Sequence, residues 1–186
     1  DKYVGKIVRA LDDLGLSDNT LLVFTSDHGH LFGQHGMTAK GPFHYEDLLR
    51  VPFIARCPSV IPRGESCNSL ISLVDLPTTF LNWAEIEVPN SMVGKNQMPV
   101  FSKDVDSVRN EVIVENRQEY TTVHLKTLVT ERFKLTVYFN QSYGELFDLL
   151  EDPKELRNLW DCNSCEDLKI TLINRLLFAE MDKEPI

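Results

Sequence analysis

The sequence predicts an α/β fold that ends in a small antiparallel sheet with a helix packed on it. Residues 1–24 combine helically spaced apolar side chains, a turn and a short apolar run, a combination typical of half an α/β unit. Residues 111–139 contain three strand-like runs rich in β-branched and aromatic side chains. Leucines at helical spacing follow between residues 165 and 181. We therefore expect alternating strands and helices first and an antiparallel sheet later.

A helix and a buried strand are expected at the start of the chain. Apolar residues at helical spacing predict a helix over residues 1–14, and the segment "GLSDNT" turns the chain. The run "LLVF" at 21–24 is short and continuously apolar, as in a strand that a parallel sheet covers on both faces. Open α/β sheets bind ligands at the carboxyl ends of such strands. The residues directly after this run are therefore candidates for a site.

Two prolines help to predict the next helices and the strand between them. A short helix is expected over residues 44–50, because Pro52 ends it, and a second apolar strand follows at 53–55. The segment "SLISLVDLPTTFLNWAEI" indicates a helix with Pro77 near its first turn, where the missing N–H costs little.

A subdomain boundary is expected near residue 100, between a first part at 1–100 and a second part at 101–186. The residues around 87–110 are rich in Pro, Asn, Ser and Gly and lack clear periodicity. The second part is predicted to hold three strands and a terminal helix, at 111–116, 124–131, 133–139 and 165–181.

Composition limits the classes of function. The 186 residues are 42% hydrophobic and carry a formal net charge of −9, which argues against nucleic-acid binding but not against a small anionic substrate. No run of 18 apolar residues exists, so no membrane span is expected. The chain begins inside a helical pattern without a Met, which indicates the start of a fragment. Localisation therefore stays open, with a weak preference for the cytoplasm.

Four cysteines are present, and two of them form a C-x-x-C pair. A single C-x-x-C is a weak zinc or redox signal, because a structural zinc site needs four ligands. We favour reduced thiols of an intracellular protein. The cysteines are Cys57, Cys67, Cys162 and Cys165.

The segment "TSDHGHLFGQHG" places Asp27 and His28 side by side after the first strand. A carboxylate next to an imidazole is part of a metal site, but at least two further ligands are needed. The alternative is that Asp27 caps the following turn and His28 is an ordinary loop residue. Lys40, twelve residues past His28, can neutralise an anion as a point charge. His35 and His44 are possible general acids or hydrogen-bond donors.

A longer segment around this pair resembles a known family. The run "LLVFTSDHGHLFGQHGMTAKGPFHYEDLLRVPFI" contains Ser26-Asp27-His28-Gly29, then Lys40, then Arg50-Val51-Pro52. This order and spacing are similar to the second signature region of the sulfatases, within the alkaline-phosphatase-like superfamily. The segments "LVTERFKLTVYF" and "GELFDLLEDPKELRNL" resemble the end of the family's C-terminal subdomain. The resemblance implies the C-terminal part of an alkaline-phosphatase-like sulfatase fold, with a small antiparallel sheet and helix as its subdomain.

The resemblance also implies chemistry. Sulfatases hydrolyse sulfate esters with a formylglycine hydrate and a divalent cation, usually Ca²⁺. Asp27 and His28 would supply two metal ligands, although the imidazole would also suit Mn²⁺ or Zn²⁺. Lys40 would act as a catalytic residue that binds the sulfate and stabilises the leaving oxygen. The family's C/S-x-P/A-x-R nucleophile motif is absent from these residues, so the formylglycine is expected upstream and the chain alone is expected to be inactive.

Further expectations concern substrate contacts and partners. His44 and His124 are carried over as candidate substrate-binding residues, and Arg50 is expected to anchor the loop. The expected substrate is a small anionic sulfate ester. Related phosphonate monoester and phosphodiester hydrolases are the alternative function, and a non-catalytic structural or binding module is the alternative from another class. An exposed sheet edge would favour a homo-oligomer or poor solubility for the isolated fragment.

Overall fold

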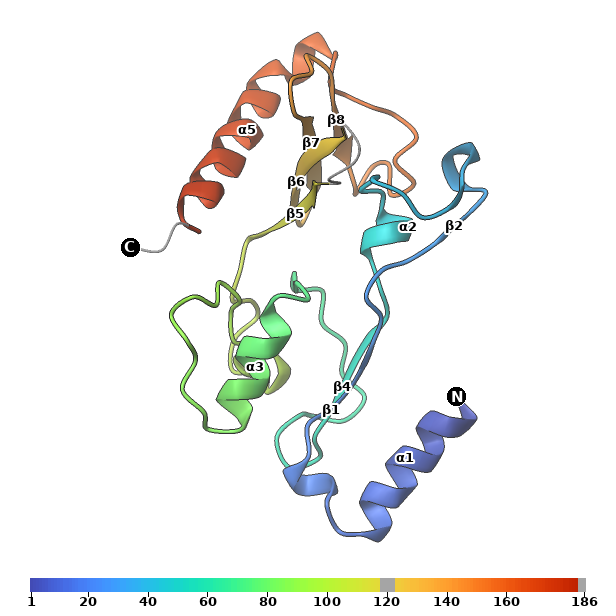
Figure 1. Ribbon diagram of the computed structural model, residues 1–186, viewed down its shortest axis with the longest axis vertical. Coiled ribbons are helices and arrows are strands. Elements are labelled where there is room, and N and C mark those ends of the chain that lie inside the picture. The colour runs from blue at the N-terminus through green and yellow to red at the C-terminus, as the bar shows by residue number, and fades with distance from the viewer. Residues whose placement is uncertain (118–122, 184–186) are drawn as a thin grey trace. The chain divides into compact units, whose positions relative to one another are not determined.

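The computed structural model describes residues 1–117 and 123–183 and divides the chain into two compact units (Figure 1). Unit 1 consists of Asp1–Ser26, Pro52–Ser69 and Leu73–Val108, and unit 2 of Asp27–Val51, Leu70–Ser72 and Arg109–Ile186. The domain boundary expected near residue 100 stays a prediction.

Unit 1 contains the expected first helix, two strands and the helix with Pro77. Its predicted elements occur close to their expected positions, and two short helical segments, η1 and α4, were not predicted. In chain order the elements are α1 (Lys2–Asp13), η1 (Ser17–Asn19), β1 (Leu22–Thr25), β4 (Phe53–Arg56), α3 (Asp75–Trp83) and α4 (Met98–Phe101).

The expectation of a parallel, fully covered first strand is wrong for this chain. Strands β1 and β4 pair antiparallel, with Leu22 opposite Arg56. Parallel pairing needs a crossover connection, usually a helix. The connection between them contains no long crossover helix, since its α-helix, α2 (Glu46–Leu49), has only four residues. Phe24 on β1 and Ile54 on β4 are 45% and 62% exposed, so these residues of unit 1 do not cover both faces of the pair.

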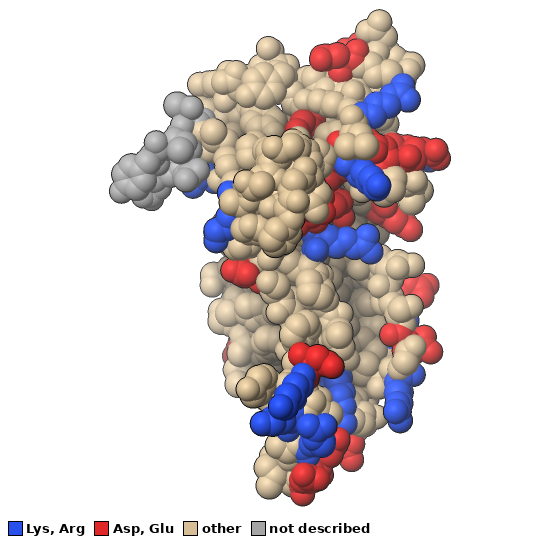
Figure 2. Space-filling view, turned by 90° about the vertical axis from the view of Figure 1, so that its right-hand side faces the viewer, with Lys and Arg blue, Asp and Glu red and all other residues tan. Residues whose placement is uncertain are grey.

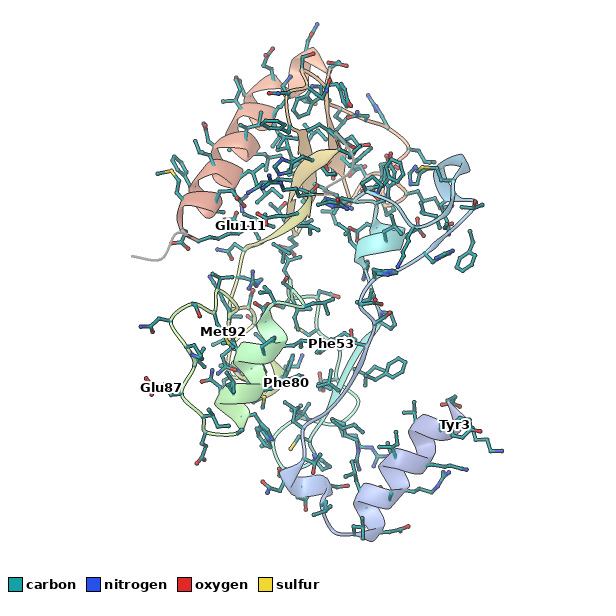
Figure 3. All side chains as sticks on the ribbon, viewed as in Figure 1. Tyr3, Phe53, Phe80, Glu87, Met92 and Glu111 are labelled. Carbon is teal, nitrogen blue, oxygen red and sulfur yellow. The ribbon has the colours of Figure 1, made fainter. Side chains whose placement is uncertain are left out.

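A buried carboxylate organises the loop that follows α3. Asp75 is fully buried and accepts hydrogen bonds from the Lys95 backbone N–H at 2.8 Å and from the Gln97 side-chain amide at 2.7 Å. Met92 and Glu87 mark this loop in Figure 3. The loop without periodicity is therefore ordered by side-chain bonds to a helix rather than by regular structure.

Unit 2 contains a four-stranded antiparallel sheet in the order β5-β6-β7-β8. The three expected strands and the terminal helix are present. Strand β8 and the small β2–β3 hairpin were not predicted, because short runs with Gly, acidic or polar residues acquire strand structure only through their partners. The elements are β2 (Leu31–Phe32), η2 (Gln34–Gly36), β3 (Thr38–Ala39), α2, β5 (Glu111–Arg117), β6 (His124–Thr130), β7 (Phe133–Tyr138), β8 (Gly144–Asp148), η3 (Asn163–Cys165) and α5 (Glu166–Met181).

The core of unit 2 lies between this sheet and α5. Side chains of the helix and the sheet fill the space between them (Figure 3). Glu111, at the start of β5, accepts two hydrogen bonds from Arg175 of α5, at 2.6 and 2.9 Å. The buried core residues are Leu128, Leu135, Leu146, Leu172 and Leu176.

The surface agrees with an acidic protein of mixed charge. Described acidic and basic side chains are interspersed on the face shown in Figure 2. Within residues 1–117 and 123–183, no helix combines the length and apolar composition that a membrane span requires.

Candidate functional site

The turn after β1 is held against α2 by a glycine. The backbone N–H of Gly29 donates to the carbonyl of Leu48 at 2.8 Å. A Cβ at position 29 would lie 1.9 Å from the carbonyl oxygen of Asp47, which no side chain can tolerate without a backbone shift. The requirement for glycine therefore sets where Asp27 and His28 stand relative to α2.

His28 contacts a carbonyl oxygen on one side of its ring and an ammonium on the other. Its Nδ1 lies 2.8 Å from the carbonyl oxygen of Gly29, and its Nε2 lies 3.0 Å from Nζ of Lys40. A carbonyl only accepts and an ammonium only donates, so these two contacts suit the neutral tautomer that carries its proton on Nδ1 and presents a lone pair at Nε2. This neutral tautomer is the form in which an imidazole binds a metal through Nε2.

Asp27 completes the cluster that the sequence predicted. Its Oδ1 accepts the backbone N–H of His28 at 3.0 Å, and its Oδ2 lies 3.4 Å from Nε2 of His28. The Asp27 side chain is 83% exposed. The structure thus brings Asp27, His28 and Lys40 together, with carboxylate and imidazole donors side by side.

These donors fit a divalent cation as part of its ligand set. A carboxylate oxygen and an imidazole nitrogen are ligands that Mn²⁺, Zn²⁺ and, less readily, Ca²⁺ accept. Among the residues that the structure describes, no group of three or more His, Cys, Asp or Glu side chains could hold a metal. A cation held by Asp27 and His28 would therefore need further ligands.

His44 lies in a different environment, inside unit 2. The residue is 5% exposed, and Nδ1 lies 2.7 Å from the hydroxyl of Thr127, which in turn lies 2.7 Å from the hydroxyl of Thr136. Burial, and then the nearby Lys134 cation, lower the pKa of His44 to about 4. The ring is held neutral against β6, and its role in substrate binding stays a prediction.

Sequence reasoning missed a buried lysine. Lys134 on β7 is 1% exposed, and its Nζ lies 2.7 Å from one carboxylate oxygen of Glu46 and 2.7 Å from one of Glu155. It also donates to the backbone carbonyl of His44 at 2.9 Å. Glu155 accepts the backbone N–H of Glu46 at 2.7 Å. Burial raises the pKa of Glu155, while Lys134 acts in the opposite direction.

This buried ion cluster, Glu46–Lys134–Glu155, anchors α2. The Tyr45 hydroxyl adds a hydrogen bond to Glu145 of β8 at 2.9 Å. Burial raises the pKa of Tyr45, and the Glu145 carboxylate adds to the effect. Since α2 also accepts the Gly29 N–H through Leu48, the contacts run continuously from the sheet to the Asp27–His28 pair.

His124 and Arg50 have separate contacts. His124 starts β6, and its backbone carbonyl accepts the Phe139 backbone N–H at 2.7 Å. Its ring centroid lies 5.4 Å from that of Phe139. Arg50 ends α2, where its backbone N–H donates to the Glu46 carbonyl at 2.8 Å. A substrate contact by His124 and loop anchoring by the Arg50 side chain stay predictions.

A comparison with known families identifies the chain. The family model for "N-sulphoglucosamine sulphohydrolase, C-terminal" matches residues 33–182. The chain belongs to the sulfatase family. The matched residues include Lys40, α2, the four-stranded sheet and all of α5, so the expected resemblance is confirmed.

Curated sulfatases match over most of this chain. It is 31% identical over 167 residues to an N-acetylglucosamine-6-O-sulfatase of Bacteroides thetaiotaomicron, covering 86% of the chain and 30% of that protein. It is 28% identical over 185 residues to an arylsulfatase of Clostridium perfringens, covering 98% and 38%. The sulfatase chain thus spans about a third of the length of these relatives.

Solved structures confirm the fold class. The structure of BT4656 in complex with its substrate D-glucosamine-2-N,6-O-disulfate matches with a TM-score of 0.87 at 26% identity, covering 99% of this chain and 39% of that one. A phosphonate monoester hydrolase of Agrobacterium radiobacter matches with a TM-score of 0.86, at 24% identity, covering 97% and 38%. The second match concerns the fold alone.

Proposed function

We propose that the intact protein hydrolyses a sulfate ester and that this chain supplies two cation ligands and one anion-binding lysine to the site. The observation that carries the proposal is the cluster of Asp27, His28 and Lys40, in which Nε2 of His28 lies 3.0 Å from Nζ of Lys40. A carboxylate, a neutral imidazole and an ammonium together can hold a cation and its anionic substrate.

Asp27 and His28 are the proposed ligands of a divalent cation. We favour Ca²⁺ because the family uses it, and Mn²⁺ or Zn²⁺ remain alternatives because of the imidazole. When bound, the cation polarises the oxygens of the sulfate. His28 Nδ1 lies 2.8 Å from the backbone carbonyl oxygen of Gly29, a contact that orients the ring with Nε2 on the opposite side.

Lys40 is the proposed sulfate-binding and catalytic residue. One lone pair cannot accept from an ammonium and ligate a cation at the same time. His28 Nε2 would hold the cation in place of its 3.0 Å contact with Lys40. The exposed Lys40 ammonium would pair with a sulfate oxygen and stabilise negative charge on the leaving oxygen.

The proposed nucleophile is a formylglycine in sequence that precedes this chain. Neither Cys57 in "CPSVI" nor Cys67 in "CNSLI" fits the C/S-x-P/A-x-R pattern. The chain by itself is therefore proposed to be inactive.

We propose a sulfated amino sugar as the substrate class. Support comes from the relatives, since one is named N-acetylglucosamine-6-O-sulfatase and another was solved with D-glucosamine-2-N,6-O-disulfate. Phosphonate ester hydrolysis is the second candidate, because phosphonate monoester hydrolases share the fold. The full-length protein, assayed on glucosamine 6-sulfate, an aryl sulfate and an aryl phosphonate, should prefer a sulfate ester. A clear preference for the phosphorus ester would overturn the proposal.

The metal ligands are tested by replacing Asp27 with Asn in the full-length protein. We expect metal affinity to fall by at least about tenfold, since even the loss of a residue that only hydrogen-bonds to a metal ligand has an effect of that size. Asp13→Asn changes an exposed aspartate of α1 and is the matched control. Elemental analysis after dialysis measures the bound metal. Unchanged metal content and activity in Asp27→Asn would remove Asp27 from the ligand set.

A further inference from the structure

A pair of cysteines lies at the turn that leads into α5. Cys162 precedes the short 3-10 helix η3, and Cys165 is its last residue. The Cys165 backbone N–H donates to the Cys162 carbonyl at 2.9 Å, which closes one turn between them. This bond from position i+3 to position i turns the chain back, so the two cysteines are neighbours in space as well as in sequence.

The two thiols have different surroundings. Cys162 Sγ lies 3.2 Å from the Ser164 hydroxyl, whereas Cys165 packs against the leucine core beneath α5. Hydrogen bonds from Ser164 and Cys165 lower the pKa of Cys162, and the contact with Cys162 raises the pKa of Cys165. An attacking thiol needs thiolate character and access, and a resolving thiol needs only proximity.

We propose that Cys162 and Cys165 form a redox-active dithiol that a low-molecular-weight disulfide, such as glutathione disulfide, oxidises to an intramolecular disulfide. The Cys162 thiolate attacks one sulfur of the small disulfide, which forms a mixed disulfide and releases one thiolate. The Cys165 thiol then loses its proton to solvent and attacks Cys162 Sγ, which releases the second thiolate. Two protein thiols are oxidised and one small disulfide is reduced to two thiols.

The other two cysteines of the chain are not placed to form such a disulfide. Cys57 is fully buried, with its Sγ 3.4 Å from the Ser59 hydroxyl. Cys67 is exposed, and neighbouring positions in the chain carry no second cysteine. Cys67 therefore serves as an internal control, a thiol that forms a mixed disulfide with no resolving partner. The proposal does not depend on the sulfatase activity.

The test uses the full-length protein in glutathione redox buffers, followed by alkylation and peptide mass spectrometry. Trypsin is expected to release one peptide, residues 158–169, that contains both Cys162 and Cys165 and no other cysteine. Oxidation should make this peptide two hydrogen masses lighter and resistant to alkylation, and dithiothreitol should reverse the change. The Cys67 peptide should instead gain one glutathione.

Two single variants separate the roles. Cys165→Ser should trap a glutathione adduct on Cys162, and Cys162→Ser should react more slowly at the remaining thiol. A wild-type peptide that stays reduced while Cys67 reacts would overturn the proposal. A stable glutathione adduct on wild-type Cys162 would overturn it as well, because it would mean that Cys165 does not resolve it.

Discussion

Two lysine clusters in unit 2 use similar groups in opposite environments. Lys40 is exposed and donates to the lone pair of His28, beside an Asp27 side chain that is 83% exposed. Lys134 is 1% exposed and is paired with Glu46 and Glu155, each at 2.7 Å. In the exposed cluster, the Lys40 contact can be replaced by contacts with bound ions at a small cost in free energy, because solvent screens exposed charges. In the buried cluster, the loss of one charged group leaves the others unpaired and is strongly destabilising. The exposed Lys40 cluster is therefore suited to binding ions, and the buried Lys134 cluster is suited to holding α2 in position.

The largest expected effect is that of Lys134→Met. The substitution leaves the buried Glu155 carboxylate and the partly buried Glu46 carboxylate without their shared cation, so unfolding free energy should fall by about 3–5 kcal/mol. Urea unfolding of the full-length protein measures the loss. Lys154→Met, at an exposed position of unit 2, is the matched control and should change stability by less than about 0.5 kcal/mol.

A companion variant sharpens this result. Adding Glu46→Gln and Glu155→Gln to Lys134→Met removes the uncompensated charges and should recover part of the lost stability. Equal stability of Lys134→Met and Lys154→Met would show that the buried ion cluster does not hold α2.

Lys40→Ala should affect catalysis rather than folding. We expect the full-length protein to lose about 2–4 kcal/mol of transition-state stabilisation, the scale of one lost oxyanion donor. Steady-state kinetics on a sulfate ester give kcat/KM, and urea unfolding should show almost no change. Unaltered kcat/KM would contradict the proposed role, and a large loss of stability would erase the contrast with Lys134.

His44→Asn should flatten the acid dependence of stability. The pKa of His44 is about 4 in the fold and near 6.5 when unfolded, so the unfolded state binds the proton first. Stability from this group is present above pH 6.5 and is lost as the pH falls towards 4. Wild type should lose roughly 2–3 kcal/mol more than His44→Asn across that window. The raised pKa of Glu155 acts in the opposite direction in both proteins.

Unfolding curves at several pH values measure this difference, with His124→Asn as the control for a half-buried histidine at the start of β6. If stability falls equally with pH in wild type and in His44→Asn, protonation of a group other than His44 causes the loss.

Tyr45→Phe should give the smallest effect. It removes one hydrogen bond to Glu145, which keeps a second one from Tyr138 at 3.0 Å. The expected loss is about 0.5–1.5 kcal/mol in unfolding free energy. Phe43→Leu, at a neighbouring aromatic position without a hydroxyl, is the comparison. A Tyr45→Phe loss as large as that of Lys134→Met would mean that the tyrosine, and not the ion cluster, is the main anchor of α2.

Sequence reasoning succeeded where the determinants are local. Asp27, His28 and Lys40 lie within one short segment, and the Lys40–His28 contact spans only 12 positions, while the roles of the three residues stay predictions. Helix α5 and the long strands follow from periodicities that a short window contains. Strand β8 was missed because its own residues favour a strand only beside β7.

By itself, the sequence determined the secondary structure of unit 2 in outline, the family of the chain and the segment that carries the candidate ligands. Each of these depends on residue order over short distances. Only the tertiary structure decided the antiparallel pairing of β1 with β4, the burial of His44 and the ion pairs of Lys134. The His44–Lys134 contact joins residues 90 positions apart, and the Glu46–Glu155 contact joins residues 109 apart. A charged side chain in a strand pattern is expected to face solvent, and only its partners from distant segments make burial favourable.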